Sequence, residues 1–419
     1  MTAAALNAAG GARLAARRGF SVRVEWWILW LLGLSGGVVL IEPSPYEVLI
    51  GVAFCILLVS GARLALSGVF MLGLLALFNL GGVVSLVPFL HDTAAVRFIA
   101  ISVYLAVTSG FYAMLVQERT QARLHALKWG IIAGGALAST AGILGYFDVA
   151  GLSGVFTLYD RASGTFKDPN VLGAFVVLPA VFLIQEILAS GRLRVRTLVP
   201  LALILFGGVF LSFSRGAWGH FVGSTGMMLV LSFLLVAGPR MRLRIVLLSF
   251  AGLVVLVTAL ALILSIDEVS TMFQQRAQLA QSYDAGTMGR FGRQLLAVPE
   301  LLERQNGYGP LQFRHFWGED PHSVYLNAFS SYGWLGGLSY LTLIGATIVI
   351  GWRTVLTPSP LQAFAIAIWS TLFVQILIGF IIDTDHWRHF YMMLGLIWGL
   401  HAASSAARRA SSAVADANR

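Results

Sequence analysis

Long apolar runs alternate with short polar segments from residue 24 to residue 403. Many of these runs approach the roughly 20 apolar residues that an α-helix needs to cross a bilayer, so we expect about twelve membrane spans. They are predicted at residues 24–41, 47–66, 68–90, 96–116, 128–150, 171–190, 197–212, 216–237, 244–266, 323–350, 361–382 and 388–403. The pattern therefore predicts an all-α polytopic protein in which residues 1–419 form a single integral membrane domain.

The composition agrees with this interpretation. Hydrophobic residues make up 58% of the chain and charged residues only 11%, whereas soluble domains carry about 25% charged residues. We expect no cleavable signal peptide, because Met1–Val24 is rich in Ala and Arg and has no apolar segment of its own. The single cysteine, Cys55, lies inside a predicted span, which excludes an internal disulfide.

The net charge of +9 does not indicate nucleic-acid binding, because the basic residues are dispersed among the loops. Their distribution indicates topology instead. The loops at residues 191–196 and 239–244 carry alternating arginines, which are typical of cytoplasmic loops under the positive-inside rule. Both termini are then expected in the cytoplasm, and the longest loop, Asp267–His322, is expected on the outer face.

The candidate chemistry gathers on this outer face. That compartment lacks nucleotide triphosphates and nucleotide sugars, so a transferase there needs a donor that was activated before it crossed the membrane. A lipid-linked diphosphate is the natural candidate. The polar residues that the topology places outside are Arg161, Lys167, Arg215, Arg290, Arg293, Arg314, His315, His322 and the cluster Asp383–His389.

Met288–Arg304, within the long loop, predicts a short helix that lies on the membrane. Arg290, Arg293 and Gln294 share its polar face by their spacing, and Pro299 is expected to bend or end its first half. Arg290 is suited to binding a diphosphate, because a guanidinium offers a planar fork of hydrogen-bond donors. The alternative is an interfacial arginine whose side chain only extends to place its charge in water. The expected apolar stripe consists of Phe291, Leu295, Leu296, Val298 and Leu302.

Arg215 lies in a turn between two spans that is short enough to hold it near the apolar boundary. A charge there is costly and generally faces a cavity or a partner, which makes this arginine a functional candidate. The alternative is a structural ion pair with Asp148 or Asp168. Asp168 is itself expected to cap the next helix, with Pro169 in the first turn.

The segment before that helix, Arg161–Asp168, contains Gly164, Thr165 and Lys167, which capping does not explain. A Gly-Thr turn beside a lysine is suited to lining an anionic pocket. The Asp383–His389 cluster also has two interpretations. Its carboxylates suggest a metal site, but we favour a salt-linked cap on the bundle, with Arg388 or His386 in contact with substrate, because Arg388 would repel a cation.

His322 precedes a long apolar run and follows Glu319, Asp320 and Pro321. Imidazole has an ordinary pKa close to neutrality, so a histidine beside several arginines suggests proton transfer next to an anion. The alternatives are a helix cap after Pro321 or an ion pair with Glu319 or Asp320. Either carboxylate is also placed to orient the imidazole.

From about Gly164 to Gly399 the chain resembles the O-antigen ligase and O-antigen polymerase superfamily, which are membrane glycosyltransferases acting on polyprenyl-diphosphate-linked glycans. The resemblance implies a GT-C-like fold in the bacterial inner membrane. It also implies that His322 is the general base, that Arg215 and Arg290 bind the diphosphate, and that transfer is inverting and needs no metal or other cofactor. Many relatives have asparagine where this chain has Ser323. The matching segments are Ser163–Phe166, Asp168–Asn170, Ser214–Gly216, Gly289–Arg290, Gly307–Gly309, Pro321–Ser323, Tyr325–Leu326 and Gly333–Gly336.

The expected function is transfer of a glycan from undecaprenyl diphosphate to lipid A-core at the periplasmic face. A polymerase that extends an O-antigen or exopolysaccharide on a growing glycan acceptor would use the same groups, and a transporter or flippase for the lipid-linked glycan is an alternative of another class. No inverted repeat favours the transporter. The sequence leaves the oligomeric state open. The expected substrate-binding residues are Arg161, Lys167, Arg293, Arg314, Tyr325 and Arg388.

Overall fold

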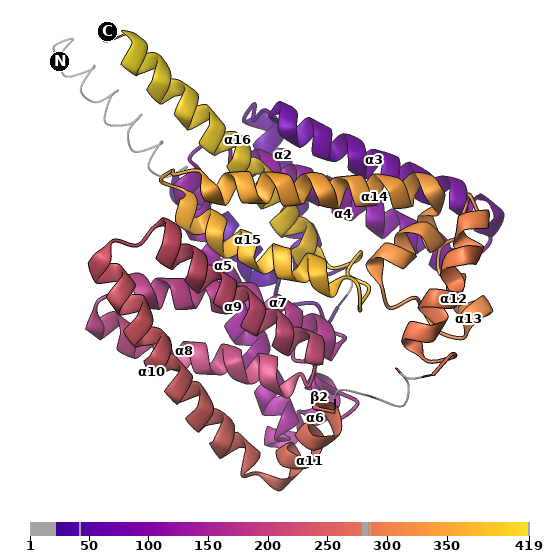
Figure 1. The fold of residues 1–419 in the computed structure, drawn as a ribbon, viewed down its shortest axis with the longest axis horizontal. Coiled ribbons are helices and arrows are strands. Elements are labelled where there is room, and N and C mark those ends of the chain that lie inside the picture. The colour runs from indigo at the N-terminus through magenta and orange to yellow at the C-terminus, as the bar shows by residue number, and fades with distance from the viewer. Residues whose placement is uncertain (1–21, 42, 279–283, 285, 418–419) are drawn as a thin grey trace, which may run out of the picture.

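The computed structural model describes residues 22–41, 43–278, 284 and 286–417. Almost all of its regular structure is helical (Figure 1). After a helix over residues 22–35, the elements are α2 (Pro45–Val59), α3 (Leu66–Leu86), η1 (Val87–Phe89), α4 (Thr93–Leu115), α5 (Thr120–Tyr146), η2 (Val149–Gly151), α6 (Ser153–Phe156), β1 (Thr157–Leu158), β2 (Arg161–Ala162), α7 (Pro169–Ala189), α8 (Arg192–Leu211), α9 (Arg215–Leu235), α10 (Pro239–Leu264), α11 (Asp267–Arg276), α12 (Arg290–Glu303), α13 (Phe313–Trp317), α14 (Val324–Leu356), α15 (Gln362–Ile378) and α16 (Arg388–Ala417).

Within the part of the chain that the structure describes, nine helices are long and apolar enough to cross a membrane. This confirms an all-α protein with multiple spans. Each predicted span overlaps a helix, but three of the twelve correspond to shorter helices: helix 22–35, α2 and α15. The number of twelve spans stays a prediction. The nine are α3, α4, α5, α7, α8, α9, α10, α14 and α16.

Most connections between successive long helices are short, which favours antiparallel neighbours, and the longest connection joins α10 to α14. Each end of the bundle is tied across helices. At one end Glu25 pairs with Arg123 of α5 at 2.6 Å, and Lys128 of α5 pairs with Glu186 of α7 at 2.7 Å. We call the other end, at which α2, α4, α7, α9, α14 and α16 begin, the site end.

Small residues bring the long helices together. A Cβ atom on Gly130 would collide with the backbone oxygen of Trp30, and one on Gly81 would collide with that of Tyr332. In a membrane, the hydrophobic effect does not drive helices together, and close packing at small residues stabilises their association instead. The second contact holds α3 against α14, and these two helices run side by side in Figure 1.

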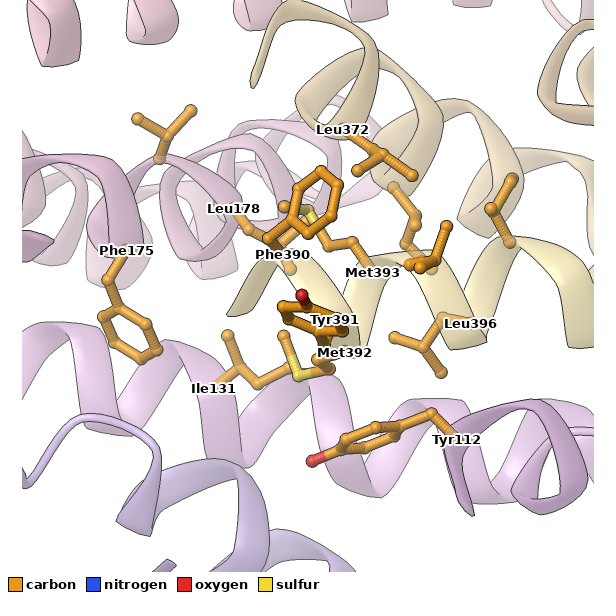
Figure 2. Close-up of a cluster of buried hydrophobic side chains, with 14 of the residues drawn as sticks. Tyr112, Ile131, Phe175, Leu178, Leu372, Phe390, Tyr391, Met392, Met393 and Leu396 are labelled. Atoms are coloured by element: carbon orange, nitrogen blue, oxygen red, sulfur yellow. The ribbon is translucent and has the colours of Figure 1, made fainter. Parts of the chain in front are cut away.

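The core is densest around the start of α16. There Tyr391, Met392 and Met393 pack against side chains of α4, α5, α7 and α15 (Figure 2). All three are at most 5% exposed. The loop before α16 is therefore held by a rigid support.

The helix α14 is interrupted at Gly333, whose φ of +66° lies in the left-handed region. The displaced backbone is satisfied by the segment before α13: the Trp334 amide donates to the Gln305 oxygen at 2.8 Å, and the Tyr308 amide donates to the Ser330 oxygen at 2.8 Å. The Gly307–Gly309 and Gly333–Gly336 segments thus form one structural joint.

Candidate functional site

Arg215 and Arg290, which are 75 positions apart in the sequence, meet on one carboxylate at the site end. Arg215 Nη2 lies 2.8 Å from Asp284 Oδ2, and Arg290 Nε lies 3.3 Å from Asp284 Oδ1. The Asp284 side chain is 9% exposed. Two guanidiniums therefore converge on a sheltered anion. The sequence-based alternative for Arg215 is a structural ion pair, and the structure shows such a pair with Asp284. The two partners suggested from the sequence have other contacts: Asp148 accepts the Ser153 amide and Asp168 caps α7.

Both arginines are the first residues of their helices, α9 and α12. The unsatisfied amide groups at a helix N-terminus favour negative charge. Ser214 precedes Arg215 and its side chain accepts from the Ala217 amide at 3.3 Å, which fixes the start of α9. Positive potential at this point therefore comes from backbone as well as side chains.

The polar face predicted for the loop helix is present in α12. Arg293 donates to Glu319 Oε2 at 2.6 Å and to the Trp317 oxygen at 3.0 Å, and Gln294 donates to the Pro321 oxygen at 2.8 Å. Arg293 thus holds the segment that carries His322, while Arg290 shares Asp284 with Arg215. Pro299 does not end the helix, because α12 continues to Glu303, and the alternative of a bend at Pro299 stays a prediction.

The apolar positions of α12 divide into two faces. Ala297 and Leu301 pack inward against Tyr308 and Phe313. The predicted stripe is exposed instead, which is the orientation that an interfacial helix requires. It consists of Phe291, Leu295, Leu296, Val298 and Leu302.

His322 lies next to this cluster in a strained backbone conformation, with φ of +50°. Asp383 Oδ2 accepts the His322 amide at 3.1 Å and lies 3.9 Å from the ring Nδ1, while Glu319 lies 4.0 Å from Nε2. Such conformations are uncommon for residues other than glycine and concentrate at functional sites. The cap of α14 is Ser323, not His322, and Asp320 pairs with Arg314.

Burial lowers the pKa of His322 below its ordinary value, and the positive charge of Arg290 lowers it further. The pKa of Asp383 is raised, because it is buried beside the Asp385 carboxylate. The histidine is thus held as a neutral imidazole near neutral pH. Sequence reasoning placed Asp383 in a bundle cap and missed its contact with His322, because the two residues are 61 positions apart.

The rest of the Asp383–His389 cluster is engaged in separate contacts. Asp385 accepts from Asn327 at 2.9 Å and from His386 at 3.2 Å, and Arg388 pairs with Glu47 of α2. Among the described residues, no three His, Cys, Asp or Glu side chains are grouped as a metal site. The cluster ties α2, α14 and α16 together.

Three other residues expected to bind substrate have structural contacts. Arg161 is buried and donates to the Ser212 oxygen at 2.7 Å and to Asn170 at 2.8 Å. Tyr325 donates to the Ile376 oxygen at 2.7 Å, and Arg314 forms a two-bond pair with Asp320 at the surface. These contacts position the loops around the site.

The Gly164–Thr165 turn is also structural. Gly164 has φ of +55°, a Cβ there would collide with the Ala138 oxygen, and Thr165 donates to the Gly37 oxygen. Lys167, in contrast, lines a cavity together with Arg388. Of Gly164, Thr165 and Lys167, the lysine is the one that lines this cavity, next to Phe166 and Asp168 of the same segment.

No model of a known protein family matches the chain, and no curated protein matches it.

Proposed function

We propose that this protein is an O-antigen ligase-type glycosyltransferase. It would transfer a glycan from undecaprenyl diphosphate to an acceptor sugar, lipid A-core, with the site end in the periplasm and both termini in the cytoplasm of a bacterial inner membrane. The observation that carries the proposal is the convergence of Arg215 and Arg290 on one sheltered carboxylate beside His322.

A diphosphate fits the position that Asp284 occupies. Carboxylates and phosphates are both bound by guanidinium forks, and charge-assisted hydrogen bonds of this kind are about twice as strong as neutral ones. A glycosyl diphosphate already carries a good leaving group, which needs charge stabilisation rather than protonation. Arg215 and Arg290 supply that stabilisation where negative charge develops.

His322 supplies the complementary step. The acceptor hydroxyl oxygen attacks the anomeric carbon, the bond from that carbon to the diphosphate oxygen breaks, and the electron pair leaves with the polyprenyl diphosphate. The hydroxyl proton passes to the ring of His322. A base must be unprotonated to accept it, and the lowered pKa of His322 meets this requirement at neutral pH.

Asp383 acts on this step through the backbone. Its carboxylate accepts the His322 amide and so supports the left-handed conformation that aims the ring. Gln294 holds the same residue from the other side, 3.3 Å from the His322 oxygen. Asp383 and Gln294 are therefore positioning residues.

The test is reconstitution of purified protein with undecaprenyl-diphosphate glycan and lipid A-core in the presence of EDTA, followed by gel analysis and mass spectrometry. The wild type should form the glycolipid and His322→Ala should not. His315→Ala is the matched control, since His315 is an exposed histidine in the same loop. Longer lipid-linked chains would identify a polymerase instead. If no new glycosidic bond forms, either on lipid A-core or on the lipid-linked glycan, glycosyl transfer is rejected and transport is favoured.

A further inference from the structure

A cavity of about 590 Å³ opens at the site end, separate from the two arginines. Its volume lies within the range of roughly 300–1,000 Å³ that is typical of small-molecule sites. Helix 22–35, α4, α5, α7 and α16 supply its walls, and the loop before α16 supplies part of its mouth. The proposed reaction leaves this space unassigned.

The walls of the cavity are apolar. They include Leu32, Ile101, Ile131, Val171, Phe175 and Met392. Figure 2 labels three of these, Ile131, Phe175 and Met392, among the packed side chains of the core. A surface of this kind is matched by a hydrocarbon chain, because burial of each methylene group contributes about 0.8 kcal/mol.

The mouth of the cavity is polar and carries more cations than carboxylates. Arg97, Lys167 and Arg388 line it together with Glu47 and Asp168. Arg388 pairs with Glu47, and Asp168 accepts the Asn170 amide at 2.6 Å. The excess positive charge next to an apolar wall is complementary to a lipid with an anionic head group.

His386 lines the same mouth. Burial opposes a charge on its ring, but the Asp385 carboxylate, 3.2 Å away, outweighs burial and raises the pKa of His386 above its ordinary value. Its Nε2 lies 3.0 Å from the Phe98 oxygen. The ring is thus fixed at the edge of the cavity.

One loop connects the cavity with the proposed catalytic base. Asp383 holds His322, and His386, Trp387 and Arg388 line the cavity three to five positions later. A head group at the cavity mouth would therefore contact the same loop that holds His322. The arginines that suit the donor meet at Asp284 and do not line the cavity.

We propose that this cavity binds the acceptor, an anionic glycolipid, with an apolar chain against Val171 and Phe175 and a phosphate at Lys167 and Arg388. The role of this lipid as the acceptor rests on the proposed glycosyl transfer. Binding itself is a separate property and is measurable without turnover.

The experiment measures retention of lipid A on the purified protein in detergent by native mass spectrometry, with phosphatidylglycerol as competitor. Val171→Trp fills part of the cavity and should weaken lipid A binding by roughly tenfold, because the indole takes the space of the lipid chain. Lys167→Gln removes a mouth charge and should weaken it by a smaller factor. Val230→Trp is the control, because Val230 is exposed on α9 and does not line the cavity.

Each outcome bears on the proposal. Loss of lipid A in Val171→Trp, with undecaprenyl-diphosphate binding and melting temperature unchanged, supports it. Equal displacement of lipid A by phosphatidylglycerol would overturn it in favour of a membrane phospholipid, and undiminished binding in both cavity variants would place the lipid elsewhere. Lipid A retention in a protein that transfers no glycan would reject the proposed function while the cavity assignment stands.

Discussion

Each end of the bundle holds a carboxylate between two arginines, but the surroundings of the two groups differ. At the site end Asp284 lies between Arg215 and Arg290, and at the opposite end Glu25 lies between Arg119 and Arg123. Arg123 is further held by the Leu115 oxygen at 2.9 Å. The Glu25 carboxylate joins helix 22–35 to the start of α5 through its ion pairs with Arg119 and Arg123. A carboxylate between two arginines is therefore not by itself a sign of catalysis.

The site end differs in its surroundings. His322 with its strained backbone and the partly buried Asp383 carboxylate lie near the arginines there, and a cavity opens at the same end of the bundle. Groups that cost stability are retained where they serve function. The comparison predicts that removal of charge harms activity at one end and stability at the other.

The largest effect is expected for His322→Ala, which removes the proposed base and should lower the transfer rate by about 10²–10⁴. The measurement is the initial rate of glycolipid formation in proteoliposomes. The melting temperature should stay near that of the wild type, because His322 is partly exposed. A rate within a few-fold of the wild type would remove His322 from the mechanism.

Arg215→Ala and Arg290→Ala are each expected to lower the rate by about 10²–10³, as for loss of a group that stabilises developing charge. Because both arginines contact one anion, the double variant should lose less than the product of the two single losses. Strict multiplication of the effects would show that the two arginines act on separate groups.

Glu25→Gln should act on stability alone. It leaves Arg123, 9% exposed at its side chain, without its carboxylate partner, and should lower the free energy of unfolding by about 2 kcal/mol. The melting temperature of the detergent-purified protein reports this loss. The rate per folded molecule should remain at the wild-type level; a specific loss of rate would break the contrast between the two ends.

Asp284→Asn should tighten binding of inorganic pyrophosphate by roughly two- to fivefold, because the competing carboxylate is removed and partly exposed ion pairs contribute about 0.2–1 kcal/mol each. Isothermal titration calorimetry at fixed ionic strength measures the change. Weaker binding in this variant would mean that Asp284 instead holds the arginines in their binding positions.

The smallest effect is a displaced pH profile. The proposed base works when neutral, so the rate should be level above the pKa of His322 and fall as the pH drops through it. Burial and Arg290 lower this pKa, so the fall should begin below the ordinary value of about 6.5. Arg290→Gln removes one cause and should move the fall to higher pH. An unmoved profile would separate Arg290 from His322.

The sequence by itself determined the long apolar helices, the helix α12, the Asp168 cap and the candidates Arg215, Arg290 and His322. These features depend on local periodicity, on capping chemistry and on the cost of charge near an apolar boundary, all of which are written within a few turns of chain. The GT-C-like architecture implied by the family resemblance stays a prediction.

The tertiary structure decided which partner each charge has. Asp284 is 69 positions from Arg215, and Asp383 is 61 positions from His322. Helix packing brings such residues together, and no local pattern records the pairing. The same holds for the cavity, whose lining residues come from several helices and from the loop before α16. It also holds for Arg161, which the sequence assigned to substrate and the fold uses to fasten β2 to the turn before α9.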